Sequence, residues 1–265
     1  MNNLIRADLF KLRKSTSFKI LFGITTVSAV LMTMMAYWIP QGKIKASMTG
    51  IGFMFSDVNM ISILGAVIAG IFICGDFDTK TIHDAITTGH SRGTVIVSKA
   101  IVFGYAVAFI LLPYAIITGI AIGTGSEFNM GSVAVGYLHL LSSEAGTVLS
   151  VSEIWKLLAI MLTLIIVYVA QLSLCVPLAF ILKKPVLVVP VYYGFSILTA
   201  QLMGIAHSSP VFDRIFSCTP YGGNYTFLTL DSVAGDILKG IVVSLAFIIL
   251  IVAVTLLFFR KSEIK

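Results

Sequence analysis

The run AIVFGYAVAFILLPYAIITGIAI, residues 100–122, carries no charged side chain and follows directly on Lys99. A helix needs about 20 predominantly apolar residues to cross the hydrocarbon core of a bilayer, and this run supplies them. Five other apolar runs of comparable length lie at 20–39, 58–74, 154–182, 185–206 and 237–259. The sequence therefore predicts an all-α, polytopic membrane protein with six transmembrane helices in one transmembrane domain, residues 1–265.

The overall composition supports this fold class. The chain is 58% hydrophobic and 11% charged, with a mean hydropathy of +1.01, whereas soluble domains are about 45–50% apolar and about 25% charged. The residues between the apolar runs are too few for a sizeable soluble domain. The net charge of +6 does not indicate a nucleic-acid partner, because the basic residues sit at the ends of the runs and form no single basic face.

The distribution of basic residues predicts the orientation. With the N-terminus inside, 13 of the 18 Lys and Arg residues fall on the inner side and 5 on the outer side. Lys and Arg are enriched in cytoplasmic loops of membrane proteins. We therefore expect both ends of the chain in the cytoplasm and a multi-pass location in a bacterial cytoplasmic membrane.

Three segments outside the apolar runs raise separate expectations. Residues 2–16 place Leu4, Ile5, Leu9 and Leu12 at helical spacing among basic residues, which indicates an amphipathic helix lying on membrane lipid. The alternative is a soluble basic leader. The outer stretches 133–141 and 208–236 contain apolar pieces too short to span. The first is either an interfacial or a re-entrant helix, and the second forms either shallow re-entrant helices or an ordinary folded loop.

Several kinds of chemistry lack a signature in the chain. No GxxxxGK[ST] or HExxH motif and no Cys/His cluster occurs, and we expect no catalytic residue, metal or cofactor in this chain. The interiors of the predicted spans contain no Asp, Glu, Lys or Arg, which argues against an ion-coupled carrier. Gln171 and Gln201 are the strongest polar groups within them. They either line a translocation path or form hydrogen bonds between helices.

The loop between the second and third runs, GDFDTKTIHDAITTGHSR at residues 75–92, is the most informative one. It opens with Asp76 and Asp78, places Ile82, Ala85 and Ile86 on one helical face, and turns at Gly89. Acidic residues near a helix N-terminus stabilise the helix. We expect a short amphipathic helix over 76–88 beneath the membrane, packed on lipid headgroups or inserted into a groove of a soluble partner.

Here the chain resembles the membrane subunits of type 2 ABC exporters. That family has an acidic residue and Gly-Thr after its second span, then an apolar helix, a Pro-x-Ser-Arg turn, and a lysine seven residues after the arginine. In this chain Lys80-Thr81 replaces Gly-Thr, Gly89-His90-Ser91-Arg92 replaces the proline turn, and Lys99 falls at the family spacing. The segment LIRADLFKLRKS, residues 4–15, is similar to the leader of peptide- and antibiotic-resistance permeases, which include bacteriocin immunity-like proteins.

The resemblance implies a permease subunit energised by a separate ABC ATPase subunit, present in two copies, which would bind ATP and Mg. The ATPase would dock on the coupling helix 76–88 and on the N-terminal interfacial helix 2–16. The residues expected to contribute are Asp76, Asp78, Thr81, Ile82, Ala85, Ile86 and Arg92. A second permease copy or a homologous permease would complete the transporter, and the cargo would be amphipathic, such as an antimicrobial peptide or antibiotic. The alternatives are a secondary transporter or channel without an ATPase, and a membrane scaffold or sensor partner.

Overall fold

The computed structural model describes residues 1–131, 134–147, 149–206 and 209–261, and every regular element within these ranges is a helix. Six helical segments are long and apolar enough to cross a membrane, as the sequence predicts. These are Thr16–Trp38, Thr49–Asp78, Arg92–Gly123, Val151–Leu182, Pro185–Ile205 and Ala234–Phe259. The protein is therefore an all-α chain with six candidate membrane spans.

Two of these spans, Thr49–Asp78 and Val151–Leu182, consist of more than one helical piece, and shorter helices connect the spans. The α-helices are α1 (Asn2–Lys14), α2 (Thr16–Trp38), α3 (Thr49–Met54), α4 (Asp57–Ala69), α5 (Gly75–Asp78), α6 (Thr81–Thr87), α7 (Arg92–Gly123), α8 (Tyr137–Ser143), α9 (Val151–Leu172), α10 (Cys175–Leu182), α11 (Pro185–Ala206), α12 (Pro210–Phe216) and α13 (Ala234–Lys261). A 3-10 turn precedes α3 at Ala46–Met48, and a π-helix, Gly70–Cys74, joins α4 to α5.

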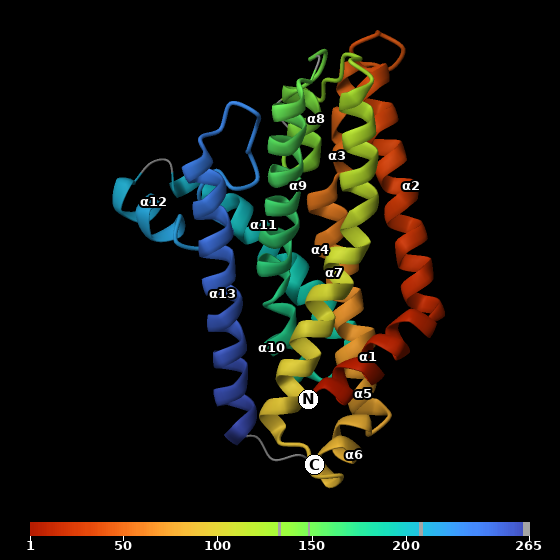
Figure 1. Ribbon diagram of the computed structural model, residues 1–265, viewed down its shortest axis with the longest axis vertical. Helices are drawn as coiled ribbons and strands as arrows, with labels where there is room; N and C mark the ends of the chain where they lie inside the picture. Colours follow the sequence, from red (N-terminus) through yellow and green to blue (C-terminus); the bar gives the residue numbers. More distant parts are fainter. Residues whose placement is uncertain (132–133, 148, 207–208, 262–265) are drawn as a thin grey trace.

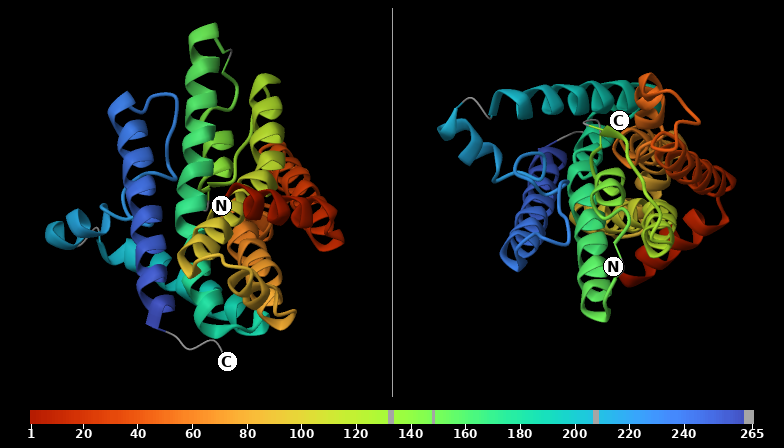
Figure 2. Two further views of the ribbon diagram at one scale, coloured as in Figure 1. Left: turned by 60° about the horizontal axis from the view of Figure 1, so that its bottom comes forward. Right: turned by 90° about the horizontal axis from the view of Figure 1, so that it is seen from above.

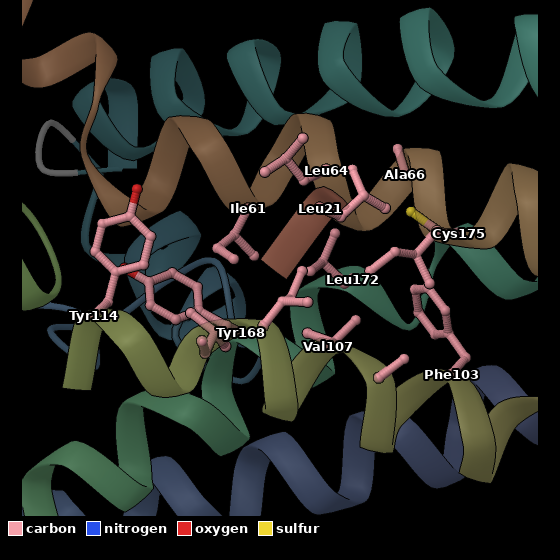
Figure 3. Close-up of a cluster of buried hydrophobic side chains, with 14 of the residues drawn as sticks. Leu21, Ile61, Leu64, Ala66, Phe103, Val107, Tyr114, Tyr168, Leu172 and Cys175 are labelled. Atoms are coloured by element: carbon pink, nitrogen blue, oxygen red, sulfur yellow. The ribbon is translucent and has the colours of Figure 1, made fainter. Parts of the chain in front are cut away.

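Helix α7 forms the centre of the bundle. It packs against α1, α2, α4, α8, α9 and α13, and Figure 1 shows it running almost the full length of the molecule. Its side chains Phe103, Val107 and Tyr114 are fully buried. They meet Ile61 of α4 and Tyr168 of α9 in the close-up of the core (Figure 3). The helices that carry Asp8, Asp57 and Tyr168, which are α1, α4 and α9, are therefore all in contact with one central helix.

Helices α11 and α13 lie at the periphery. Only 17% of the apolar window in each is buried, compared with 56% for α7. Helix α11 is inclined to the other spans and carries α12 out to the side of the bundle (Figures 1 and 2). At one end of the molecule lie α1, α5, α6 and the start of α7, called here the α6 end; α8 lies at the opposite end, called here the α8 end.

The structure corrects the predicted limits of the spans. The run 185–206 coincides with α11, but three helices extend well beyond their runs: 58–74 lies within Thr49–Asp78, 100–122 within Arg92–Gly123, and 237–259 within α13. Run 20–39 is shifted to Thr16–Trp38. Hydropathy detects only the apolar part of a helix, whereas the helix continues to its capping residue. Ser91 provides such a cap for α7, because its Oγ accepts a hydrogen bond from Thr94 N at 3.2 Å.

The fourth run, 154–182, is not one uninterrupted helix. It extends over α9 and α10, which are separated at Ser173-Leu174. Pro177 has no N–H to donate to the carbonyl of Ser173, and that carbonyl instead accepts from Val176 N at 3.0 Å. The break therefore follows from the proline in the run.

Candidate functional site

A buried group of charged side chains links three segments at the α6 end. Asp8 and Lys11 come from α1, Asp76 from α5, and Lys99 from α7. We call these four residues the ionic junction. Asp8, Asp76 and Lys99 are buried, and Lys11 is half exposed. Two carboxylates face two ammonium groups, so the junction is electrically balanced.

Lys99 is the centre of the ionic junction. Its Nζ lies 2.6 Å from Asp8 Oδ1 and also forms a salt bridge with Asp76 Oδ2, while Lys11 pairs with Asp76 Oδ1. Ser98 Oγ donates to the second oxygen of Asp8 at 3.2 Å, and the Lys99 ammonium lies 4.4 Å from the centre of the Phe72 ring. Buried charges are tolerated when they are paired and hydrogen-bonded in this way. The sequence placed Lys99 at the start of a span but gave no indication of its partners.

The segment expected to be one helix over 76–88 is two helices. Helix α5 continues from the π-helix, the chain turns at Thr79 and Lys80, and α6 covers Thr81–Thr87. Lys80 has φ 58°, a left-handed conformation that favours glycine. It occupies the position at which the exporter family has glycine. The turn predicted at Gly89 is present, with φ +95°.

The structure orients the apolar face of α6 towards the bundle. Ile82 is 1% exposed, and Ala85 and Ile86 pack against the core of the same chain. Asp78 and Thr81 are exposed, Arg92 is half-buried, and Asp76 is buried in the ionic junction. A partner that approaches α6 would therefore meet its polar face, so the expected docking residues divide into an exposed set and a packed set.

The predicted amphipathic segment 2–16 is helix α1, which ends at Lys14. Its apolar residues Leu4, Ile5, Leu9 and Leu12 pack against the core, and α1 contacts α7. The apolar face therefore covers protein, while Phe10 is exposed. Helix α1 is attached to the bundle both by this face and by the ionic junction.

Gln171 and Gln201 have different surroundings. Gln171 Nε2 donates to the Pro220 carbonyl at 2.8 Å, and Tyr221 donates to the Gln171 carbonyl. Gln171 thus ties α9 to the segment between α12 and α13. Gln201 is exposed on α11. The structure does not bring the two amides together as one path.

A second buried carboxylate was missed by the sequence analysis. Asp57 lies inside the helical segment Thr49–Asp78 and is fully buried, so the expectation of charge-free spans was wrong. The predicted run began one residue later, at Val58, because Asp57 itself lowers the local hydropathy. Asp57 Oδ2 accepts hydrogen bonds from Tyr168 Oη and from Tyr137 N, the latter at 3.0 Å. Its Oδ1 has no hydrogen-bond partner among the residues that the structure describes.

Gly136 allows this arrangement. It has φ +64°, and a Cβ built there would lie 1.9 Å from Tyr168 Oη and 2.1 Å from Asp57 Oδ2. The glycine therefore lets the backbone at the start of α8 approach the carboxylate closely. We call Asp57, Gly136, Tyr137 and Tyr168 the Asp57 site. Tyr114, also buried, lies beside Tyr168 in Figure 3 and donates to the Phe55 carbonyl at 2.8 Å.

The two outer stretches have different structures. In 133–141, Val133 lies outside the described residues, and α8 begins at Tyr137 with Leu138, Leu140 and Leu141 fully buried. This segment is a packed helix rather than an exposed loop. In 208–236, Ser208 lies outside the described residues, and α12 contains no buried residue. The two stretches are joined where Gly136 N donates to the Thr226 carbonyl at 2.8 Å. Just after α8, the Glu144 carboxylate accepts from Leu230 N at 2.8 Å. Burial raises the pKa of Glu144 and lowers that of His139.

The described residues contain no group of three or more His, Cys, Asp or Glu side chains that could hold a metal ion. No family model matches the chain. No curated protein matches it either.

Proposed function

We propose that this chain is the permease subunit of an ATP-driven exporter of the type 2 ABC class in a bacterial cytoplasmic membrane. In this proposal the α6 end faces the cytoplasm, and a separate ATPase subunit supplies ATP hydrolysis. Two ATPases and two permeases form the transporter. The six apolar helices, the excess of basic residues on one side and the family-like segments 4–15 and 75–99 support this assignment.

The observation that carries the proposal is the ionic junction. In such a transporter, movement of the ATPase subunit must displace a cytoplasmic helix, and that displacement must move the membrane spans. Helices α5 and α6 with the turn between them, residues 75–87, are called here the α5–α6 arm. Asp76 links this arm to Lys99 of α7 and Lys11 of α1. Because separating a buried ion pair costs about 3–5 kcal/mol, movement of this arm is expected to take α1 and the start of α7 with it.

The surface offered to the ATPase is the polar face of the α5–α6 arm. Asp78, Thr81, His83 and Asp84 are exposed there, while Ile82 packs inwards. We therefore propose that the exposed residues bind the ATPase. Ile82, Ala85 and Ile86 instead pack α6 against the bundle. The cargo we propose is an amphipathic molecule, such as an antimicrobial peptide or an antibiotic, as the resemblance implies.

Co-purification of the native complex tests docking. Asp78→Arg with Asp84→Arg reverses two exposed charges on the arm without touching the ionic junction. We expect the wild type to retain an ATPase subunit in mild detergent and the double variant to lose it. Glu127→Arg, an exposed substitution in the loop after α7, is the matched control and should retain the ATPase. Absence of any ATPase with the wild type would contradict the proposal.

A cysteine-labelling experiment tests the orientation independently. Among the three cysteines, Cys218 is exposed and Cys74 and Cys175 are buried. In the proposed topology Cys218 faces outwards, so a membrane-impermeant maleimide should label intact cells, and Cys218→Ser should abolish the labelling. Labelling that requires broken cells would invert the topology and remove the α6 end from the cytoplasm.

The Asp57 site favours a second candidate function, an ion-coupled secondary transporter. Intramembrane carboxylates commonly mark ion or proton pathways, and Asp57 Oδ1 is buried without a partner. Transport that persists without ATP, collapses with a protonophore and is lost in Asp57→Asn would establish this function. We rank it second because Tyr168 and Tyr137 already occupy the other carboxylate oxygen.

A further inference from the structure

A groove lies at the elbow where α1 turns into α2, on the side facing α7. It has a volume of about 610 Å³ and is lined by the apolar and aromatic residues Leu9, Leu12, Phe18, Phe22, Tyr105 and Phe109, together with Arg13 and Lys19. The turn itself is the single extended residue Ser15, whose Oγ accepts from Phe18 N at 3.4 Å. Figure 1 shows this elbow at the edge of the bundle, where α1 meets α2.

The aromatic part of the groove is built from α2 and α7. The Phe109 ring lies 5.1 Å from the Phe22 ring and 5.8 Å from the Phe18 ring, centre to centre. Tyr105, one helical turn from Phe109, is more than half exposed. Because each helical residue rises about 1.5 Å, Phe22 lies roughly 10 Å along the helix axis from Ser15. The groove is therefore polar at the elbow, where Arg13 and Lys19 lie, and apolar farther along α2 and α7.

The charges at the elbow are not neutralised within the described part of the chain. Arg13 and Lys19 are exposed, and neither forms a salt bridge with a carboxylate there. Lys11, on the same helix, is paired with Asp76. Two free cations next to an apolar aromatic wall match a molecule with an anionic head and hydrocarbon chains. They repel a second copy of the same surface and a cationic peptide.

We propose that this groove binds an anionic phospholipid, with the phosphate-bearing headgroup at Arg13 and Lys19 and an acyl chain against Phe22, Phe109 and Tyr105. Helices with basic faces at a membrane surface attract anionic lipids. The groove volume falls within the range of small-molecule pockets, about 300–1,000 Å³, so it holds the headgroup region and the adjoining chain segment. The proposal requires only the membrane-spanning fold and is independent of the exporter assignment.

The test measures lipid preference with the full chain in phosphatidylcholine nanodiscs. Spin-labelled phosphatidylglycerol and spin-labelled phosphatidylcholine are the probes, and the immobilised fraction of each gives their relative association. Each cation near an anionic lipid strengthens association about fivefold. We expect the wild type to prefer phosphatidylglycerol, and Arg13→Gln with Lys19→Gln to lower that preference at least tenfold.

Two further variants locate the site. Lys14→Gln removes an exposed charge from the same helix, outside the groove, and should change the preference less than twofold. Phe22→Ala shortens the aromatic wall and should reduce immobilisation of both lipids without altering their ratio. The proposal is overturned if the wild type shows no preference for phosphatidylglycerol, or if Lys14→Gln lowers that preference as much as the groove variant does. It is also overturned if both lipids are as strongly immobilised by Phe22→Ala as by the wild type.

Discussion

The ionic junction and the Asp57 site bury carboxylates in opposite ways. At the α6 end, Asp8 and Asp76 are matched by Lys11 and Lys99. Towards the α8 end, Asp57 receives hydrogen bonds from a tyrosine hydroxyl and a backbone N–H. No ammonium group of the described residues forms a salt bridge with it. The first arrangement gains its stability from paired charges, and the second gains it from neutral donors fixed by close packing. Removing a charge should therefore have different consequences at the two sites.

The largest effect is expected for Lys99→Met. This substitution removes the ammonium group that Asp8 and Asp76 share, and Lys11 remains to pair with Asp76 only, so Asp8 is left buried without a cation. Breaking a buried pair in this way costs about 3–5 kcal/mol. Thermal unfolding in detergent should show a large fall in midpoint. Lys14→Met, an exposed substitution on α1, is the control.

A second variant shows whether this loss arises from charge. Asp8→Asn combined with Lys99→Met neutralises the carboxylate left unpaired, so it should recover part of the lost stability. If the double variant is less stable than Lys99→Met alone, packing of the lysine chain, rather than the balance of charges, holds the ionic junction together.

Gly136→Ala should come next, at about 3 kcal/mol of destabilisation. The added methyl group would collide with Tyr168 Oη and Asp57 Oδ2, and overpacking of this kind costs about 1–3 kcal/mol. The backbone at φ 64° and ψ −130° lies outside the left-handed α region and adds about 1–3 kcal/mol for a residue with a Cβ. Gly125→Ala separates the two contributions, because Gly125 has φ +64° but nothing within 4 Å of its Cβ position. Equal unfolding midpoints for the two variants would show that close packing at the Asp57 site contributes nothing.

Asp57→Asn should have a smaller effect, about 1 kcal/mol. The amide oxygen still accepts from Tyr168 and Tyr137, and no cation is left unpaired, so the change costs only the difference between hydrogen bonds to a charged and to a neutral acceptor, about 1 kcal/mol. The unfolding midpoints of Asp57→Asn and Lys99→Met are compared in the same thermal unfolding assay. A loss as large as that of Lys99→Met would mean that Asp57 has an unrecognised cationic partner, and it would move the ion-coupled transporter ahead of the exporter.

The comparison also separates what the sequence could predict from what it could not. Six spans follow from composition and hydropathy, because a bilayer requires apolar helices of a minimum length. The turn at Gly89 follows from local chemistry. The partners of Lys99 do not, since Asp8 lies 91 residues away in the chain and only the packing of α1 on α7 brings them together. One sequence pattern cannot specify such distant contacts.

The Asp57 site was missed for a related reason. A hydropathy window ends at a charged residue, so Asp57 was placed outside the span that in fact contains it. The donors that make its burial possible come from α8 and α9, and the approach of α8 depends on the glycine before it. Similarly, the apolar face of α6 was visible in the sequence, but whether it would cover a partner or the chain itself was a question of tertiary packing.

The smallest effect, and the only gain in stability, is expected for Lys80→Gly. Both sites contain a residue with positive φ at a turn: Gly136 at the Asp57 site and Lys80 beside the ionic junction. Lys80 is exposed, so its side chain offers little packing to offset a left-handed backbone that costs about 1–2 kcal/mol for a residue with a Cβ. Glycine also loses more chain entropy on folding, which leaves a net gain of about 0.5–1 kcal/mol. Lys80→Ala removes the charge but keeps the Cβ, so it should not raise the unfolding midpoint. If the alanine variant is stabilised as much as the glycine variant, the charge of Lys80 rather than its backbone is the unfavourable feature, and the turn of the α5–α6 arm is free of strain.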